Sequence, residues 1–302
     1  MNLAPIILFV YNRPWHTQQT VEALSKNDLA KESELFIYSD GAKNDLVRGA
    51  VKEVREYIED ISGFKKVTII KRRGNFGLAH SIIDGVTEIV NEFGTVIVLE
   101  DDLVTSHHFL TYMNKSLAFY ENVENVASIH GYTYPIKDLP NSFFIRGADC
   151  WGWATWKKKW EIFEPNGEKL LDELTQKCLK NKINMNGSYN FTKLLKRQID
   201  GKNDSWAVRW YISAFLHEMY TLYPGQSFVQ NIGFDSKGTH CGDTKLFDVK
   251  LAENVVFKKI QVVENIEARK KIEVFLKKTN PSFIKRLYLI IFTEIRKPLK
   301  FF

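Results

Sequence analysis

The chain contains 302 residues, of which 44% are hydrophobic and 13% aromatic, so we expect a globular protein with a sizeable core in one large or two smaller domains. Its three cysteines have no paired, metal-type spacing, which argues against a disulfide framework and favours an intracellular protein. The net charge is +6, but residues 269–302 contain ten basic and two acidic residues, so the remainder is slightly acidic. A nucleic-acid-binding face needs basic residues across the folded body, and we therefore expect no nucleic-acid partner.

The first hundred residues alternate between strand-like and helix-like segments. The N-terminus enters an apolar run without the pattern of a secretory signal, so we expect no secretion and a cytoplasmic location. Four short apolar runs resemble strands buried on both faces: 5–11, 34–39, 66–71 and 95–100. Helical patterns lie between them, near residues 16–27, 47–61 and 78–92. This alternation predicts an α/β fold with a mostly parallel sheet flanked by helices.

Each predicted strand ends in polar or turn-forming residues. In parallel sheets, ligands bind beyond the carboxyl ends of the strands, so these ends should converge on one site. The residues at these ends include Tyr11, Arg13, Asp40, Arg73, Asn75, Glu100, Asp101 and Asp102.

The fourth strand ends in three consecutive carboxylates, Glu100, Asp101 and Asp102. Their mutual repulsion would be relieved by a hard divalent cation such as Mn²⁺ or Mg²⁺, which is usually held by one or two carboxylates together with substrate phosphates. A solvated acidic turn is the alternative. The chain lacks a P-loop and a GxGxxG motif, which argues against kinases and Rossmann dehydrogenases, and the first strand lacks the glycine-rich loop expected of a nucleotidyltransferase.

The second half of the chain contains no internal repeat and no linker, so we expect it to complete the same domain. A helix is predicted at residues 106–120 and a buried helix at 205–219, and residues 150–160 form a tryptophan-rich cluster. We predict a catalytic domain over residues 1–265, with a nucleotide-binding half at 1–125 and an acceptor half at 126–265. Residues 266–302 form a basic amphipathic tail.

The sequence Glu100-Asp101-Asp102-Leu103 after the fourth strand resembles the EDDL motif of glycosyltransferases with the GT-A fold. Within that fold the chain resembles N-acetylglucosaminyltransferase I and related bacterial transferases of capsule and O-antigen synthesis, over about residues 4–243. The resemblance implies a metal-dependent, inverting transfer of a sugar from a UDP-sugar donor to a glycan or lipid-linked glycan acceptor in surface polysaccharide synthesis.

The resemblance also implies roles for individual residues. Asp102 would bind the metal, and Glu100 and Asp101 would contact the donor. Asp40 would read the uracil edge. The other residues implied on the donor side are Tyr11, Arg13, Arg73, Asn75, Trp151 and Trp153. The tryptophans lie in a segment similar to a region near the donor sugar, and aromatic rings stack on the apolar faces of sugars. Core packing is their alternative, which we prefer for Trp156 and Trp160.

The resemblance also implies a role for two residues farther along the chain, and for each of them another role is possible. Asp204 resembles the catalytic base of a WDDW element, although Ser205 stands where the second aspartate is expected, and Asp204 could instead cap the following helix. His240 resembles a late histidine that contacts the metal or diphosphate, and a surface-loop histidine is the alternative.

The C-terminal tail contains a six-residue apolar run, Leu287 to Phe292, which is far too short to span a bilayer. Basic residues flank the run, so it could lie peripherally in a membrane interface, or it could belong to a helix packed on the body. Two other functions remain open: a nucleotidyltransferase or metal-dependent phosphohydrolase that uses the same carboxylates, and a non-catalytic glycan-binding scaffold.

Overall fold

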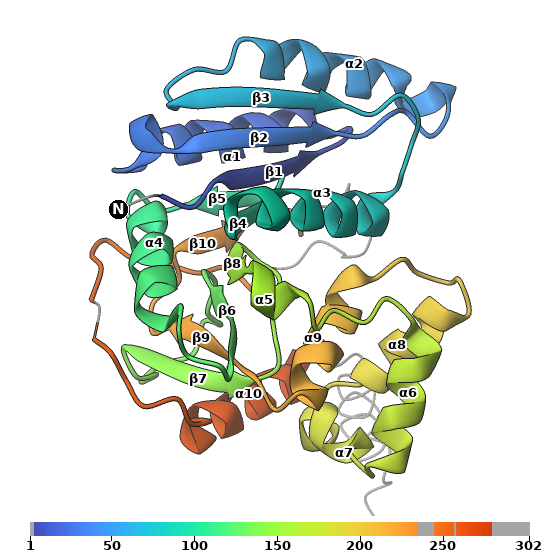
Figure 1. The fold of residues 1–302 in the computed structure, drawn as a ribbon, viewed down its shortest axis with the longest axis vertical. Helices are drawn as coiled ribbons and strands as arrows, with labels where there is room; N and C mark the ends of the chain where they lie inside the picture. Colours follow the sequence, from blue (N-terminus) through green and yellow to red (C-terminus); the bar gives the residue numbers. More distant parts are fainter. Residues whose placement is uncertain (1–2, 235–244, 257, 280–302) are drawn as a thin grey trace, which may run out of the picture.

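The computed structural model describes residues 3–234, 245–256 and 258–279. Figure 1 shows a central sheet with helices on both sides. The helices are α1 (Pro14–Ser25), α2 (Asp45–Glu59), α3 (Leu78–Phe93), α4 (Phe109–Tyr120), α5 (Lys157–Trp160), α6 (Gly167–Gln176), α7 (Lys180–Ile183), α8 (Phe191–Ile199), α9 (Trp206–Leu216) and α10 (Ile266–Thr279). Short 3-10 helices occupy Ala30–Glu32 (η1) and Met185–Gly187 (η2).

The strands are β1 (Ile6–Val10), β2 (Glu34–Ser39), β3 (Lys66–Lys71), β4 (Thr95–Glu100), β5 (Leu103–Thr105), β6 (Val126–His130), β7 (Ser142–Arg146), β8 (Trp153–Trp156), β9 (Tyr220–Pro224) and β10 (Val229–Asn231). Eight of them form the main sheet in the order β3-β2-β1-β4-β8-β6-β9-β7, and β10 pairs with β5 in a small second sheet. The first four main-sheet strands pair in parallel, as predicted, and both predicted halves of the domain contribute to this sheet.

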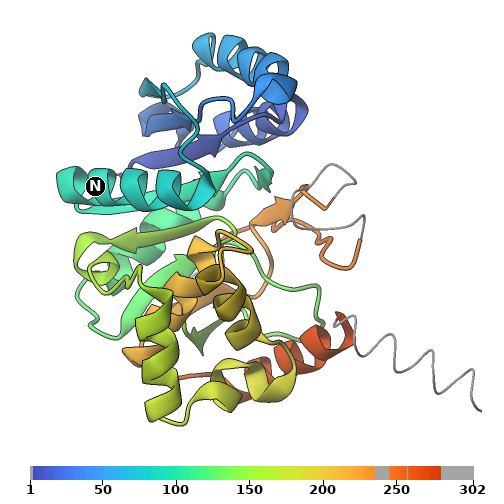
Figure 2. The same ribbon diagram turned by 90° about the vertical axis from the view of Figure 1, so that its right-hand side faces the viewer.

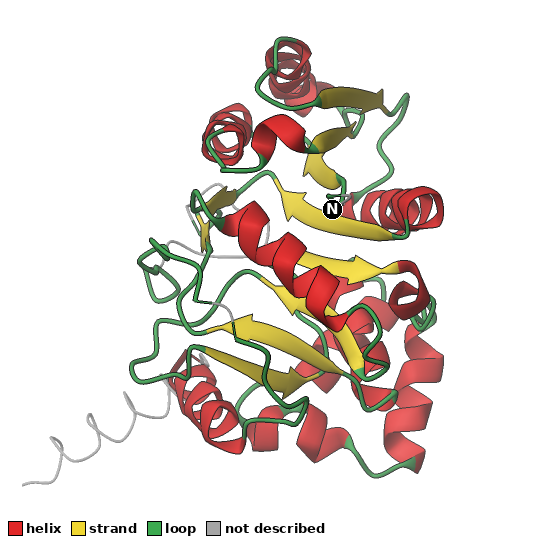
Figure 3. Ribbon diagram, turned by 60° about the vertical axis from the view of Figure 1, so that its left-hand side comes forward, coloured by secondary structure: helices red, strands yellow, loops and turns green. Residues whose placement is uncertain are grey.

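The buried strands pack on both faces because successive side chains point to opposite sides. Ile6 and Leu8 of β1 face a core cluster that includes α1, α2 and α4, whereas Ile7 and Phe9 face a cluster with α3 and α9. Figure 3 shows helices on both sides of the sheet. This double coverage explains why the sequence of these strands is hydrophobic without alternation.

The second half differs from the sequence prediction at residues 153–156. This tryptophan-rich segment forms β8, a central strand that pairs antiparallel with both β4 and β6. Strand β8, with its aromatic residues, therefore lies between the four parallel strands β3, β2, β1 and β4 and the remaining strands β6, β9 and β7.

Helix α10 packs on the body, so the first part of the predicted tail is a docked helix. Ala268, Ile272 and Leu276 are buried in a third core cluster with residues of α6, α8 and α9. Figures 1 and 2 both place α10 at the end of the molecule opposite α2. The apolar run Leu287 to Phe292 lies outside the described residues. None of the described helices has both the length and the hydropathy needed to cross a bilayer.

Candidate active site

The acidic residues lie where β4 ends beside β1, so that Arg13, which follows β1, reaches them. Nη1 of Arg13 is 2.7 Å from Oδ2 of Asp102 and 3.8 Å from Oδ1 of Asp101. The Thr20 hydroxyl of α1 donates a hydrogen bond to the carbonyl oxygen of Asp101 at 2.9 Å. The structure thus brings Arg13, Asp101 and Asp102 together, as the strand-end argument predicts.

The acidic cluster carries more negative charge than Arg13 compensates. Burial raises the pKa of Glu100 well above its usual value, and the charges of Asp102 and Asp101 add to the effect. Burial and the charge of Asp102 raise the pKa of Asp101 to about 7, against the opposing effects of Arg13 and of a hydrogen bond from the backbone of Tyr11. These shifts mean that an additional cation would be electrostatically favourable at this position.

Asp102 lies against the segment that follows β10. The backbone N–H of Ile232 donates to the carbonyl oxygen of Asp102 at 2.9 Å, and a Cβ on Gly233 would lie 2.0 Å from Oδ2 of Asp102. A larger residue at position 233 would therefore displace this carboxylate from its present position. His240 lies outside the described residues, so its predicted metal role stays a prediction.

The residues present fit a divalent cation only if the substrate supplies further ligands. Within the described part of the chain, no three His, Cys, Asp or Glu side chains converge as a complete metal site. Asp102 offers hard oxygen ligands, and the electrostatics favour a cation beside it. Mg²⁺ and Mn²⁺ are commonly held in this way, by one or two carboxylates with substrate phosphates and water.

The carboxylate of Asp40 is fully hydrogen-bonded within the protein. Its Oδ1 accepts hydrogen bonds from the backbone N–H groups of Gly41 and Phe76, both at 2.8 Å. Its Oδ2 accepts hydrogen bonds from Nδ2 of Asn75 and from the backbone N–H of Gly77, both at 2.9 Å. Each carboxylate oxygen is therefore already used twice, so in this conformation Asp40 shapes the loop before α3 and has no lone pair left for a uracil edge.

The same loop positions the other predicted donor residues. Asn75 donates to Asp40 and to the carbonyl oxygen of Gly41, which holds residues 74–77 against the end of β2. Arg73 is exposed, whereas its neighbour Arg72 pairs with Asp84 and lies 4.6 Å from the ring centroid of Phe76. Of the two arginines, Arg73 is therefore the one available to a ligand. The Tyr11 hydroxyl accepts a hydrogen bond from the backbone N–H of Lys43 at 3.1 Å.

The two predicted sugar-stacking tryptophans have different environments. Trp153 has no exposed surface, and its ring stacks on Trp206 with centroids 5.4 Å apart. As a residue of the central strand β8 it belongs to the core, and in this conformation it presents no surface to a donor sugar. Trp151 is only partly buried and contacts Tyr132 and Phe247, so it keeps an exposed portion. Trp156 and Trp160 are buried, as we preferred.

Asp204 is free of the capping role that was its alternative. The N-cap of α9 is Ser205, whose hydroxyl accepts the backbone N–H of Val208, whereas the side chain of Asp204 is 64% exposed. A Cβ on Gly77 would lie 3.4 Å from Oδ2 of Asp204, so this carboxylate lies beside the loop that Asp40 organises. Tertiary contact thus brings Asp204 to the loop at the end of β3, more than a hundred residues earlier.

Sequence reasoning missed Asp149. Its carboxylate accepts a hydrogen bond from the Tyr223 hydroxyl at 2.9 Å and one from the backbone N–H of Cys150 at 2.8 Å. The pKa of Cys150 is raised by burial and also by the charges of Asp149, Glu100 and Asp102, so the thiol of Cys150 lies within electrostatic reach of both Asp149 and the acidic cluster. No local motif marks it, since its side-chain partner Tyr223 comes from the distant strand β9.

The family comparison identifies the class of protein. The family model for glycosyl transferase family 2 matches residues 6–178, which is more than half of the chain. The chain belongs to glycosyl transferase family 2, and its sheet is that of a GT-A glycosyltransferase. The match includes the acidic cluster and ends before Asp204. No curated protein shows significant similarity to the whole sequence.

Partial similarity is found to solved glycosyltransferase structures. The mannosyltransferase PcManGT from Pyrobaculum calidifontis, in complex with GDP-Man and Mn²⁺, shares 15% identity over 45% of this chain and 36% of its own, with a TM-score of 0.32. TarS 1-349 from S. aureus shares 13% identity over 54% of this chain and 50% of its own, with a TM-score of 0.36. The TarS complex with UDP-GlcNAc gives 13% identity, coverages of 46% and 36%, and a TM-score of 0.32. The chain therefore spans half or less of the length of these structures.

Proposed function

We propose that this chain transfers a sugar from a UDP-sugar to a glycan or lipid-linked glycan, with inversion and with Mn²⁺ or Mg²⁺, in surface polysaccharide synthesis. The observation that carries the proposal is the acidic cluster at the end of β4, whose three carboxylates face one arginine. A divalent cation would offset the negative charge of this cluster and could at the same time bind the diphosphate of a nucleotide-sugar donor. Family membership supports glycosyl transfer over nucleotidyl transfer or phosphate hydrolysis.

In this proposal the acidic cluster and the loop of residues 74–77 have separate tasks. Asp102 would hold the cation, and the bound cation would supply stabilisation of negative charge on a diphosphate leaving group. Glu100 and Asp101 orient the donor, and the exposed Arg73 contributes positive charge at the end of β3. Asp40 and Asn75 keep the loop of residues 74–77 in place through the hydrogen bonds described above.

Asp204 is the proposed base. Its exposure and its place beside Gly77 support this role, because the base must reach an acceptor hydroxyl that enters from solvent. Such a base typically contributes about 10² to 10⁴ in rate. The partly exposed Trp151 offers an aromatic face to a sugar ring.

The test combines donor binding with turnover. UDP-sugars and GDP-sugars are screened by thermal shift with and without Mn²⁺, because a bound donor stabilises the folded chain according to its affinity. We expect stabilisation by a UDP-sugar that requires the metal, followed by slow UDP release. Asp102→Asn should lose the metal-dependent stabilisation, whereas Asp204→Asn should keep it and lose transfer. Pyrophosphate release from a nucleoside triphosphate would instead favour a nucleotidyltransferase.

We also propose that the catalytic domain comprises residues 1–265 and that the chain acts at the cytoplasmic face of a membrane, with peripheral contact through its basic C-terminal segment. The basic and apolar composition of residues 281–302 supports this contact. Deletion of Pro281 to Phe302 should then weaken binding to anionic vesicles. Unchanged vesicle binding by the shortened chain would contradict the role of this segment.

A further inference from the structure

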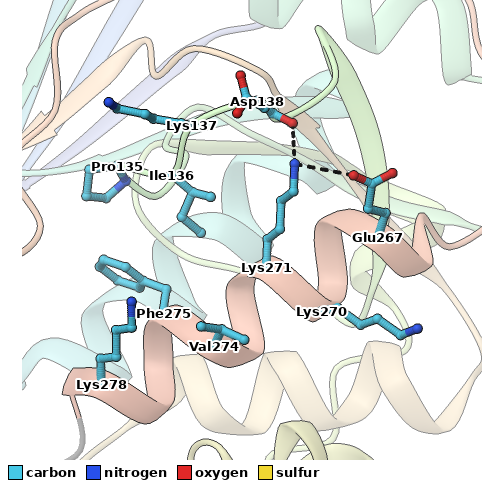
Figure 4. A pocket seen from close by; sticks show the side chains of 10 residues that line it. All are labelled: Pro135, Ile136, Lys137, Asp138, Glu267, Lys270, Lys271, Val274, Phe275 and Lys278. Carbon is cyan, nitrogen blue, oxygen red and sulfur yellow. Dashed lines mark hydrogen bonds and ion pairs between the residues drawn. The ribbon is translucent and has the colours of Figure 1, made fainter.

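A groove of about 460 Å³ lies between α10 and the segment that follows β6. Figure 4 shows its side chains, which come from residues 135–138 and from α10 between Glu267 and Lys278. Its lining comprises Pro135, Ile136, Lys137, Asp138, Glu267, Lys270, Lys271, Val274, Phe275 and Lys278. Four lysines against two acidic residues give the groove a net positive charge, and the remaining residues are apolar.

The lysines of this groove differ in how they are used. Lys271 donates a hydrogen bond to the carbonyl oxygen of Asp138 at 2.6 Å and lies 3.3 Å from Glu267, as the dashed lines in Figure 4 indicate. It joins the two walls of the groove. Lys137, Lys270 and Lys278 are exposed and form no ion pair with any described residue. These three positive charges are therefore available to an anionic ligand.

The arrangement along α10 favours an anion with an apolar part. Lys270, Val274 and Lys278 follow one another at intervals of four residues, so they lie along one face of the helix. Val274 is 56% exposed between the two lysines, and Phe275 also lines the groove. A soluble phosphate would use the lysines but not the exposed valine.

The opposite face of α10 is held rigidly. The buried Arg269 pairs with Glu264 at 2.7 Å and with Glu273 at 2.9 Å, and it donates to the carbonyl oxygen of Lys182 at 2.8 Å. The helix is thus a fixed part of the body that presents lysine side chains outward. In sequence it runs directly into residues 280–302, with five further basic residues and one acidic residue.

We propose that this groove binds the phosphate head group of an anionic membrane lipid, with Lys270, Lys278 and Lys137 facing the phosphate and Val274 facing the acyl boundary. The proposal deepens the membrane contact proposed above and rests on it for the choice of a lipid as occupant. Lipid binding in this groove would also determine which side of the molecule faces the membrane. Phe275 contacts Phe247, with centroids 5.7 Å apart, and Phe247 contacts Trp151 at 5.8 Å, so the groove is joined to the candidate sugar site by two aromatic contacts.

The test is flotation of the full-length chain with vesicles of phosphatidylcholine, with or without phosphatidylglycerol. Each basic residue near an anionic surface contributes about fivefold to partitioning, so the double variant Lys270→Gln with Lys278→Gln should bind the anionic vesicles about 30-fold more weakly. The matched control replaces Arg48 and Lys52 by glutamine, since these exposed residues of α2 lie at the other end of the molecule and remove the same charge. The control should bind as the unaltered chain does.

Equal vesicle binding by the groove variant and the control would overturn the proposal, even if deletion of Pro281 to Phe302 abolishes binding. A second result would also overturn it: inorganic pyrophosphate stabilises the unaltered chain but not the groove variant, while their vesicle binding stays equal. The groove would then be a soluble phosphate site. Both double variants should retain stabilisation by UDP-sugar and Mn²⁺, so failure of the lipid site is distinguishable from failure of the proposed glycosyl transfer.

Discussion

The variant Asp40→Asn tests whether Asp40 shapes the loop of residues 74–77 or instead reads the nucleotide base. An asparagine can keep the two hydrogen bonds accepted by one oxygen, but its NH₂ group would face the two donors that bind the other oxygen. Hydrogen bonds to a charged group contribute about 1.5 to 3 kcal/mol each. Because Asn75 and Phe76 are exposed and water can replace part of the loss, we expect a cost of about 2 to 4 kcal/mol.

The assay is thermal unfolding of the chain without nucleotide. For a chain of this size, about 1 kcal/mol changes the Tm by about 2 °C, so Asp40→Asn should lower the Tm by about 4 to 8 °C. Asp204→Asn is the matched control, because it makes the same chemical change at a 64% exposed carboxylate that caps no helix. It should leave the Tm unchanged. If Asp40→Asn also leaves the Tm of the nucleotide-free chain unchanged, the inferred loop-shaping role is refuted.

Three further predictions follow from single positions. Trp153→Ala should lower the free energy of unfolding, measured in urea, by about 3 to 5 kcal/mol, because this fully buried ring packs on Trp206. A loss below about 1 kcal/mol would show that Trp153 is not a core residue. Gly233→Ala should weaken Mn²⁺-dependent donor binding by about 10-fold to 100-fold, because the added Cβ would displace the Asp102 carboxylate. The control is Gly49→Ala, since Gly49 has open space around it. Equal metal dependence of donor binding in the two variants would contradict the prediction. Burial lowers the pKa of His130 below its usual value, so protonation favours the unfolded chain and stability should fall as the pH drops below about 6.5. His130→Asn should lose less stability than the unaltered chain over that pH range in denaturant titrations, and equal losses would contradict this.

The first half of the fold and the acidic cluster followed from the sequence by itself. The strands β1 to β4 read as apolar runs because they are buried on both faces, and the predicted and observed limits agree within one residue at each end of the 34–39, 66–71 and 95–100 segments. The strand-end argument also placed Arg13 near Asp101 and Asp102, since β1 and β4 are neighbours in the sheet.

The remaining assignments depended on tertiary contacts between residues far apart in the chain. The periodicity of the tryptophan-rich residues 151–160 does not distinguish a sugar-binding surface from a buried strand. Trp153 is buried only because β8 pairs with β4 and β6. The four donors that occupy Asp40 come mostly from a loop about 35 residues later, which no local pattern reveals. Likewise, the N-terminus of α9 is next to Gly77 only because α9 packs on α3. Local hydrophobic pattern determined which segments became strands and helices, whereas long-range packing decided which polar side chains remained available to a ligand.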